Sequence, residues 1–211
     1  MQLVARRKRR QQTPAERAQR RDQLLDAAEA TLRREGPTAS MEAMASEAGV
    51  TKPILYKHFG SKDGLADALA ERWVNLLGEG VESALTGTDD PRVQVEATIR
   101  AYLGFIDEHP EIYRFLLDES RPGARRTVED FASKLTLRLM FVLAVQFQRH
   151  GVDSATAEPF AHALVGMVRQ VSDWWLHAEA RMPLDDVAEL LSQLAWHGLA
   201  GLPLESPTQV A

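Results

Sequence analysis

Three lysines, a histidine and a tyrosine, all able to donate hydrogen bonds to anionic oxygen atoms, lie between positions 52 and 62. They are Lys52, Tyr56, Lys57, His58 and Lys62. Side chains of these types commonly hold the phosphate groups of nucleic acids. Ser61 is a preferred helix N-cap, which places Lys62 at the first helical position, where its charge opposes the positive end of the helix dipole. That placement is favourable when a phosphate occupies the helix end, so this stretch indicates phosphate recognition.

Two short helices and a tight turn are expected to position these side chains. Ser40 is a good N-cap for a helix over residues 41–48, and Gly49 ends that helix because glycine tolerates the left-handed conformation. Thr51 can cap the next helix, and Pro53 falls in its first turn, where the missing N–H costs nothing. This pattern predicts a helix-turn-helix, whose second helix docks in the major groove of DNA. An ordinary helical hairpin in an all-helical domain is the alternative interpretation.

The stretch GVTKPILYKHFGSKDGL at residues 49–65, together with the helix before it, resembles the DNA-binding domain of the TetR (tetracycline-repressor) family of bacterial transcriptional regulators. The resemblance covers about residues 24–69, and its core LYKHF-x-SK-x-x-L is specific to that family. It implies that Tyr56, His58 and Lys62 hold DNA phosphates and that Thr51, Lys52, Pro53 and Lys57 approach the groove. Ile54 departs from the family pattern, in which a small or hydroxylated residue is frequent, so any base contact it makes would be apolar. The expected DNA-contacting residues are therefore Ser40, Thr51, Lys52, Pro53, Ile54, Tyr56, Lys57, His58 and Lys62.

The charge of the chain is unevenly distributed. The net charge is −5, but residues 1–62 contain 13 Lys and Arg against 7 Asp and Glu, whereas residues 63–211 contain 12 against 23. A basic N-terminal part on an acidic remainder suits a DNA-binding head on a body that does not bind DNA, because phosphate contacts dominate affinity. A solvated basic tail on an acidic protein is the alternative explanation.

The residue content argues against several other functions. The chain has no cysteine, which excludes disulfides, thiolate zinc sites and cysteine nucleophiles. Its six histidines are scattered, and no glycine-rich phosphate loop or nucleophile elbow is present. The pairs Asp89-Asp90 and Asp185-Asp186 stand where acids act as helix caps. We therefore expect no enzyme, no metal site and no cofactor. No apolar run approaches the roughly 20 residues that span a bilayer, and the basic N-terminus lacks a secretory apolar segment, so a cytoplasmic protein is expected.

Helical periodicity and breaker residues predict an all-α fold in two parts. A disordered basic arm at residues 1–12 precedes a head at residues 13–62, whose first helix starts at the capping box Thr13 to Glu16. The body covers residues 63–205, and a frayed tail covers residues 206–211. A helix from Lys62, with an apolar face of Leu65, Leu69, Trp73, Leu76 and Leu77, links head to body, frays at Gly78 and Gly80, and ends in the segment from Thr86 to Pro91. Further helices are expected over residues 91–109, from 110 onward, and over 124–150, 154–180 and 183–201.

The body is expected to pair two heads and to bind a small molecule. One head reads too few base pairs for useful specificity, whereas a two-fold dimer reads two half-sites. The family resemblance implies a dimer through the last two helices and a ligand cavity in the body. The expected dimer residues are Phe160, Leu164, Trp175, Leu191, Leu194 and Trp196. The expected ligand residues are Tyr102, Phe105, Tyr113, Phe131, Phe147, Met167, Gln170, Trp174 and His177. For both sets, a plain place in the intrachain core is the alternative.

These observations predict a homodimeric, ligand-responsive transcriptional regulator without enzymatic activity. By the family resemblance it is a repressor that binds a palindromic or pseudopalindromic operator in double-stranded DNA, and a small hydrophobic or aromatic effector, which includes an acyl chain, releases it. The alternative is an architectural or non-specific DNA-binding protein with no ligand response. The large apolar body argues against that alternative, because DNA packaging does not require it.

Overall fold

The computed structural model describes residues 13–88, 90–149 and 151–197. These residues form α-helices with one short 3-10 turn and no strand, which confirms the all-α prediction. The helices are α1 (Pro14–Glu35), α2 (Met41–Glu47), α3 (Lys52–Phe59), α4 (Lys62–Thr86), α5 (Pro91–Glu108), α6 (Pro110–Leu117), α7 (Pro122–Arg149), α8 (Ala157–His177) and α9 (Leu184–His197), with the 3-10 turn at Ser154–Thr156. The predicted basic arm at 1–12 and the frayed tail at 206–211 lie outside the described residues.

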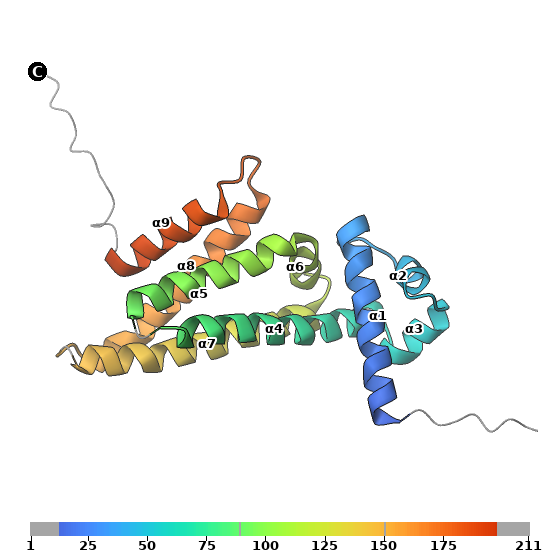
Figure 1. The fold of residues 1–211 in the computed structure, drawn as a ribbon, viewed down its shortest axis with the longest axis horizontal. Helices are drawn as coiled ribbons and strands as arrows, with labels where there is room; N and C mark the ends of the chain where they lie inside the picture. The colour runs from blue at the N-terminus through green and yellow to red at the C-terminus, as the bar shows by residue number, and fades with distance from the viewer. Residues whose placement is uncertain (1–12, 89, 150, 198–211) are drawn as a thin grey trace, which may run out of the picture.

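The head is formed by α1, α2 and α3, which pack at one end of the molecule (Figure 1). The predicted capping box begins α1: Glu16 N donates to Thr13 Oγ1 at 3.2 Å, and Thr13 N donates to Glu16 Oε2 at 2.8 Å. Leu24 and Leu32 of α1 share a buried core with Met44 of α2 and Leu55 of α3. The three short elements therefore stabilise one another through a common apolar centre.

Helix α4 runs from the head along the body (Figure 1). Leu65, Leu69, Trp73 and Leu77 are buried as predicted, but Leu76 is 45% exposed because it lies 100° around the helix from Leu77. Helix α4 ends at Thr86, within the predicted end segment, but the predicted fraying at Gly78 and Gly80 is wrong, because the helix continues through both glycines. At Gly78 a Cβ would lie 3.5 Å from Phe131 of α7, so the small residue there allows two helices to pack closely.

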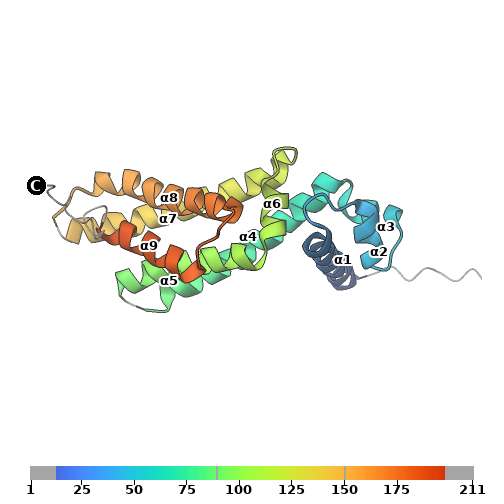
Figure 2. The same ribbon diagram turned by 90° about the horizontal axis from the view of Figure 1, so that it is seen from above.

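The remaining helices form the body, in which α4, α5, α7, α8 and α9 lie lengthwise beside one another (Figure 2). A second buried core joins Ile99, Leu103 and Ile106 of α5 to residues of α8 and α9. Helix α7 begins at Pro122, two residues before the predicted start at residue 124, in keeping with the tolerance of proline in the first turn of a helix. None of the helices in the described ranges is long and apolar enough to cross a bilayer.

Substitution of Gly64 by alanine is expected to destabilise the junction between head and body. A Cβ on Gly64 would overlap the carbonyl oxygen of Phe59, which is backbone and cannot rotate away. We expect Gly64→Ala to lower the free energy of unfolding by about 1–3 kcal/mol. Gly80→Ala is the matched control on the same helix, because a Cβ there meets open space; it should raise stability by about 0.5–1 kcal/mol. Urea unfolding measures both, and equal midpoints for wild type and Gly64→Ala would contradict the predicted clash.

Candidate functional site in the head and the body

The turn between α2 and α3 is held by a side-chain cap and by one glycine. Ser40 Oγ accepts a hydrogen bond from Ala43 N at 3.1 Å, which confirms it as an N-cap. Gly49 has a φ of 62°, in the left-handed region, and Val50 N donates to Ala45 O at 2.9 Å. Thr51 precedes α3 at the cap position, but its side chain makes no capping hydrogen bond. The two helices are thus fixed at a tight corner with the start of α3 exposed.

Helix α3 buries one side in the head core and exposes the other. Leu55 and Phe59 face the core, whereas Ile54 and Tyr56 are 40% and 39% exposed. The exposed members of the predicted DNA-contacting set are Ser40, Thr51, Lys52, Pro53, Ile54, Tyr56 and Lys57. Lys52 also forms an ion pair with Glu42 of α2, with Nζ and Oε2 3.6 Å apart. The structure therefore brings these predicted residues together around one exposed end of the molecule.

His58 lies partly buried among basic residues. Arg21 of α1 donates from Nη1 to the His58 carbonyl oxygen at 3.4 Å and places its guanidinium 4.8 Å from the centre of the Phe59 ring. Burial lowers the pKa of His58, and the charges of Arg20, Lys57 and Arg21 lower it further. Those same cations create a positive potential, which favours a DNA phosphate at this edge of α3.

Lys62 is placed differently from the other predicted phosphate ligands. Its Nζ donates to the Ala39 carbonyl oxygen at 2.6 Å and lies 5.8 Å from the centre of the Phe115 ring of α6. Burial lowers the pKa of Lys62, and Arg121 lowers it further. In this structure the side chain therefore ties the start of α4 to the connection before α2 and to α6, and its role as a phosphate ligand stays a prediction.

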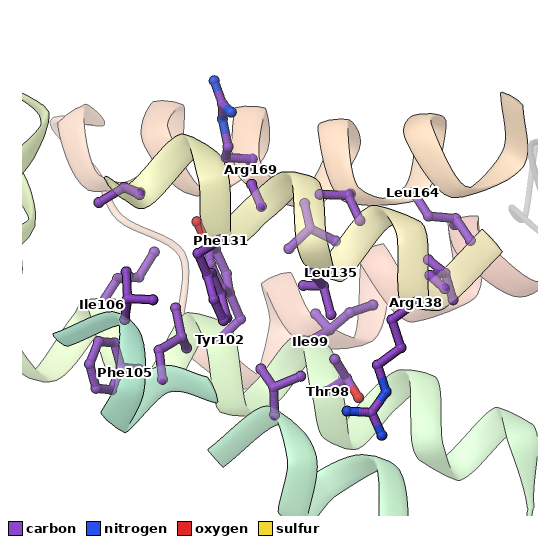
Figure 3. Close-up of a pocket in the computed structure, with 18 of the residues that line it drawn as sticks. Thr98, Ile99, Tyr102, Phe105, Ile106, Phe131, Leu135, Arg138, Leu164 and Arg169 are labelled. Atoms are coloured by element: carbon purple, nitrogen blue, oxygen red, sulfur yellow. The ribbon is translucent and has the colours of Figure 1, made fainter. Parts of the chain in front are cut away.

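An elongated cavity of about 160 Å³ runs through the body (Figure 3). Its lining comes mainly from four helices: Trp73, Val74, Leu77, Val81 and Leu85 of α4; Val95, Thr98, Ile99, Tyr102, Phe105 and Ile106 of α5, with His109 directly after that helix; Val128, Phe131, Ala132, Leu135, Arg138, Leu139 and Val142 of α7; and Leu164, Val165, Met167, Val168 and Arg169 of α8. From Trp73 to Leu85 the helix rise corresponds to about 18 Å. Nearly all of these side chains are apolar, so the cavity suits an apolar group.

The predicted ligand residues divide between the cavity and the outer surface. Tyr102, Phe105, Tyr113, Phe131 and Met167 line the cavity. The prediction is wrong for Phe147, Gln170, Trp174 and His177, which are not among its lining residues. Phe147 packs edge-on against Phe160, with ring centres 5.5 Å apart. Gln170, Trp174 and His177 are exposed on α8. They share one side of that helix because they are spaced four and three residues apart.

A few polar groups interrupt the apolar lining. Burial raises the pKa of both Tyr102 and Tyr113, whose hydroxyl groups interact with each other. Thr98 Oγ1 and His109 Nδ1 are buried without a hydrogen-bond partner. Neither Thr98 nor His109 was predicted to bind ligand. Thr98 lies one helical turn before Tyr102, and that spacing is the sequence signal for a shared face.

Trp73 connects the cavity to the head. Its ring lines the cavity, with centroid distances of 4.7 Å to Phe105 and 4.3 Å to His109. Its Nε1 donates a buried hydrogen bond of 3.0 Å to Oε1 of Glu29 on α1. Glu29 is itself 6% exposed and is also paired with Arg72 of α4, whose Nε lies 3.5 Å away. A side chain in the cavity wall is thus bonded directly to the first helix of the head.

The predicted dimer residues do not form one surface. Trp175 and Leu191 are 2% and 4% exposed, so their assignment to a dimer interface is wrong. Trp175 packs in the core shared with α5 and α9 and donates from Nε1 to the Met182 carbonyl oxygen at 2.8 Å. Leu164 lines the cavity, and Leu194 is partly buried. Of the predicted set, Phe160 and Trp196 are exposed, at 55% and 46%.

Two family models match the chain. The model for bacterial regulatory proteins of the tetR family matches residues 24–69, and the model for a tetracyclin repressor-like C-terminal domain matches residues 80–207. An uncharacterized HTH-type transcriptional regulator of Mycobacterium tuberculosis strain H37Rv is 30% identical over 185 residues, which cover 87% of this chain and 79% of that protein. The HTH-type transcriptional activator FasR of Mycolicibacterium smegmatis is 32% identical over 192 residues, which cover 89% of this chain and 86% of that protein.

Solved structures show the same architecture. A TetR-like transcriptional regulator from Rhodococcus sp. RHA1 is 29% identical, with a TM-score of 0.66, and the match covers 91% of this chain and all of that one. FadR from Bacillus subtilis, solved in complex with stearoyl-CoA, has a TM-score of 0.69 at 15% identity over 84% of this chain and 98% of that one, a likeness of fold alone. With its helix-turn-helix head and helical cavity-bearing body, the chain belongs to the TetR family of transcriptional regulators.

Proposed function

We propose that this chain is a homodimeric regulator that binds a two-fold operator and is released from it by a small hydrophobic effector held in the body. The observation that carries the proposal is the position of Trp73, whose ring lines the cavity while its Nε1 is bonded to Glu29 of the head. A ligand that favours a different position of this ring also favours a different position of α1. The change in operator affinity then equals the ligand's differential affinity for the two arrangements.

The effector class follows from the shape and lining of the cavity. The lining along α4 extends about 18 Å from Trp73 to Leu85 and is apolar over almost all of its surface. A linear aliphatic chain matches such a cavity better than a compact polar molecule, because each buried methylene contributes about 0.8 kcal/mol. FadR from Bacillus subtilis, which shares the fold, was solved with stearoyl-CoA. We therefore narrow the effector to a molecule with a long acyl chain.

A dimer is required for the operator to be read as two half-sites. Exposed aromatic and aliphatic side chains on the last two helices support this part of the proposal: Phe160 and Trp174 on α8, and Leu190 and Trp196 on α9. Large apolar residues of this kind are typical of interface cores. In this proposal Trp174 and Leu190, which are exposed, take the place of their buried neighbours Trp175 and Leu191.

The proposed sign of regulation is repression, with the effector lifting it. The FasR relative from Mycolicibacterium smegmatis carries the name of an activator, so activation is the second candidate. A reporter driven by the chain's own operator distinguishes the two. Repression predicts that deletion of the protein raises transcription, whereas activation predicts that deletion lowers it.

Selection of DNA from a random pool by the full chain tests the proposal. We expect an inverted repeat whose half-sites are centred one helical turn, about 34–36 Å, or a multiple of it apart. Sedimentation of the free protein should give a dimer at micromolar concentration. Selected DNA with no shared sequence would instead support the architectural alternative, and a monomer in both free and bound states would contradict the two-fold model.

A further inference from the structure

The cavity lining includes a charged side chain, Arg138, and an unpartnered hydroxyl, that of Thr98. Arg138 of α7 lines the cavity and forms an ion pair with Glu82 of α4, with Nη2 2.9 Å from Oε1. Figure 3 shows the Arg138 side chain reaching from α7 in the direction of Thr98 on α5. Arg169 also lines the cavity, but its guanidinium points away from the interior in that view. Arg138 therefore supplies the positive charge at this end of the lining.

The hydroxyl of Thr98 differs from those of the other threonines inside helices. Thr31, Thr86, Thr127 and Thr136 each donate to the carbonyl oxygen four residues earlier, at distances from 2.8 to 3.2 Å. That bond is the usual way in which a helical threonine satisfies its hydroxyl. Thr98 Oγ1 makes no such bond and is buried without any partner. A buried hydroxyl left unpaired is costly, and a ligand oxygen in the cavity would satisfy it.

The exposure of the ion pair indicates where a ligand enters. The side chains of Arg138 and Glu82 are 48% and 47% exposed, whereas the opposite end of the lining, at Trp73, is 5% exposed. A ligand with an apolar chain and a polar head is therefore accommodated with its chain toward Trp73 and its head at Arg138. The other buried polar atom of the cavity lining without a hydrogen-bond partner is His109 Nδ1; its ring lies against Trp73, and burial lowers the pKa of that imidazole.

We propose that Arg138 and Thr98 form a subsite for the oxygen-bearing head of an acyl-chain effector, and that Glu82 occupies Arg138 until the effector binds. This assignment rests on the proposed function, since it places the head of the proposed effector. Arginine presents paired donors that match a carboxylate, and the Thr98 hydroxyl donates to the same group or to a thioester carbonyl. Glu82 repels an anionic head, so its carboxylate moves away when the head binds. The α4–α7 ion pair is then broken on the same helix that carries Trp73.

Three probes test the subsite: stearate, stearoyl-CoA and the uncharged 1-octadecanol, with binding measured by quenching of tryptophan fluorescence. We expect Arg138→Met to weaken at least one of the two acyl probes by about 10-fold or more, because a charge-assisted hydrogen bond is lost. Thr98→Val should weaken the same probe several-fold. Glu82→Gln should strengthen it, because the competing carboxylate is removed. Octadecanol should bind Glu82→Gln and wild type alike. Arg100→Met, which removes a half-exposed arginine of α5 outside the cavity lining, is the matched control and should bind all probes as wild type does.

The outcomes distinguish a free carboxylate from a coenzyme A thioester as the polar group of the effector. They also distinguish failure of the subsite from failure of the proposed effector class. A loss confined to stearate identifies the free carboxylate, and a loss confined to stearoyl-CoA identifies the thioester with its phosphates. Equal affinities of wild type and Arg138→Met for both acyl probes would overturn the subsite while leaving an acyl effector in place. No binding of any probe by the wild type would overturn the effector class and the subsite with it.

Discussion

Replacement of Trp73 by phenylalanine is expected to leave the protein able to bind both its operator and an acyl effector while largely uncoupling the two. Phenylalanine keeps an aromatic ring in the cavity wall but removes the Nε1–H that donates to Glu29. We expect the effector to lower operator affinity about tenfold or more in the wild type, which corresponds to about 1.4 kcal/mol of coupling, and less than threefold in Trp73→Phe. Operator titrations with and without saturating stearoyl-CoA measure both factors.

Trp175 provides the matched control for this substitution. Trp175→Phe also removes a buried indole N–H, here one that donates to Met182 O, but Trp175 does not line the cavity or contact the head. In Trp175→Phe the effector should lower operator affinity by the same factor as in the wild type, even if the free energy of unfolding is reduced. Glu29→Gln should retain most of the coupling, because the amide oxygen still accepts from Trp73. Full coupling in Trp73→Phe would show that α1 is moved by another contact.

Removal of Lys57 or of the Tyr56 hydroxyl is expected to weaken operator binding strongly without changing the fold. Both side chains are exposed on α3, so their loss costs little stability. In a dimer each substitution is made twice: Lys57→Ala removes two positive charges at the groove, and Tyr56→Phe removes two hydroxyl donors to phosphate. We expect affinity to fall about 10- to 100-fold for Lys57→Ala. The slope of log affinity against log salt should fall by about 1.8 for Lys57→Ala, because each contact contributes about 0.9. Tyr56→Phe should weaken binding with little change in slope, because tyrosine is uncharged.

Lys134→Ala serves as the control, since Lys134 is an exposed lysine of α7 in the body. It removes the same charge per chain but should leave the salt slope unchanged. An unchanged slope in Lys57→Ala as well would mean that α3 does not face the DNA backbone. Reduced affinity and reduced slope in both variants would mean that long-range charge, rather than contact through α3, governs binding.

The head was predictable because its signals are local. Ser40, Ser61 and the Thr13–Glu16 box each cap a helix within three residues, so the sequence alone determines where those helices begin. Lys62 shows the limit of such reasoning. The sequence correctly placed Lys62 at the start of a helix. Its side-chain partners, Ala39 and Phe115, come from segments far along the chain. Local pattern does not determine a contact of that kind.

The body was less predictable because its helices are apolar around much of their circumference. Trp174 is 56% exposed and Trp175 is 2% exposed, although they are neighbours, because successive residues point 100° apart on a helix. The sequence does not specify which side of such a helix faces the core. The aromatic residues of α5 and α7 were assigned to the cavity correctly for Tyr102, Phe105 and Phe131. For Thr98 the only sequence signal is its spacing of one turn from Tyr102, and Arg138 gave none, because the role of each depends on the helix opposite it.

The central claim is that the cavity and the DNA-binding head are energetically coupled, and a reciprocal titration of the wild-type protein tests it most directly. Operator affinity is measured with and without saturating stearoyl-CoA, and stearoyl-CoA affinity is measured with and without saturating operator. The two ratios must be equal if the sites are coupled through one equilibrium. We predict a factor of about ten or more in both directions. Binding of stearoyl-CoA that leaves operator affinity unchanged would contradict the account.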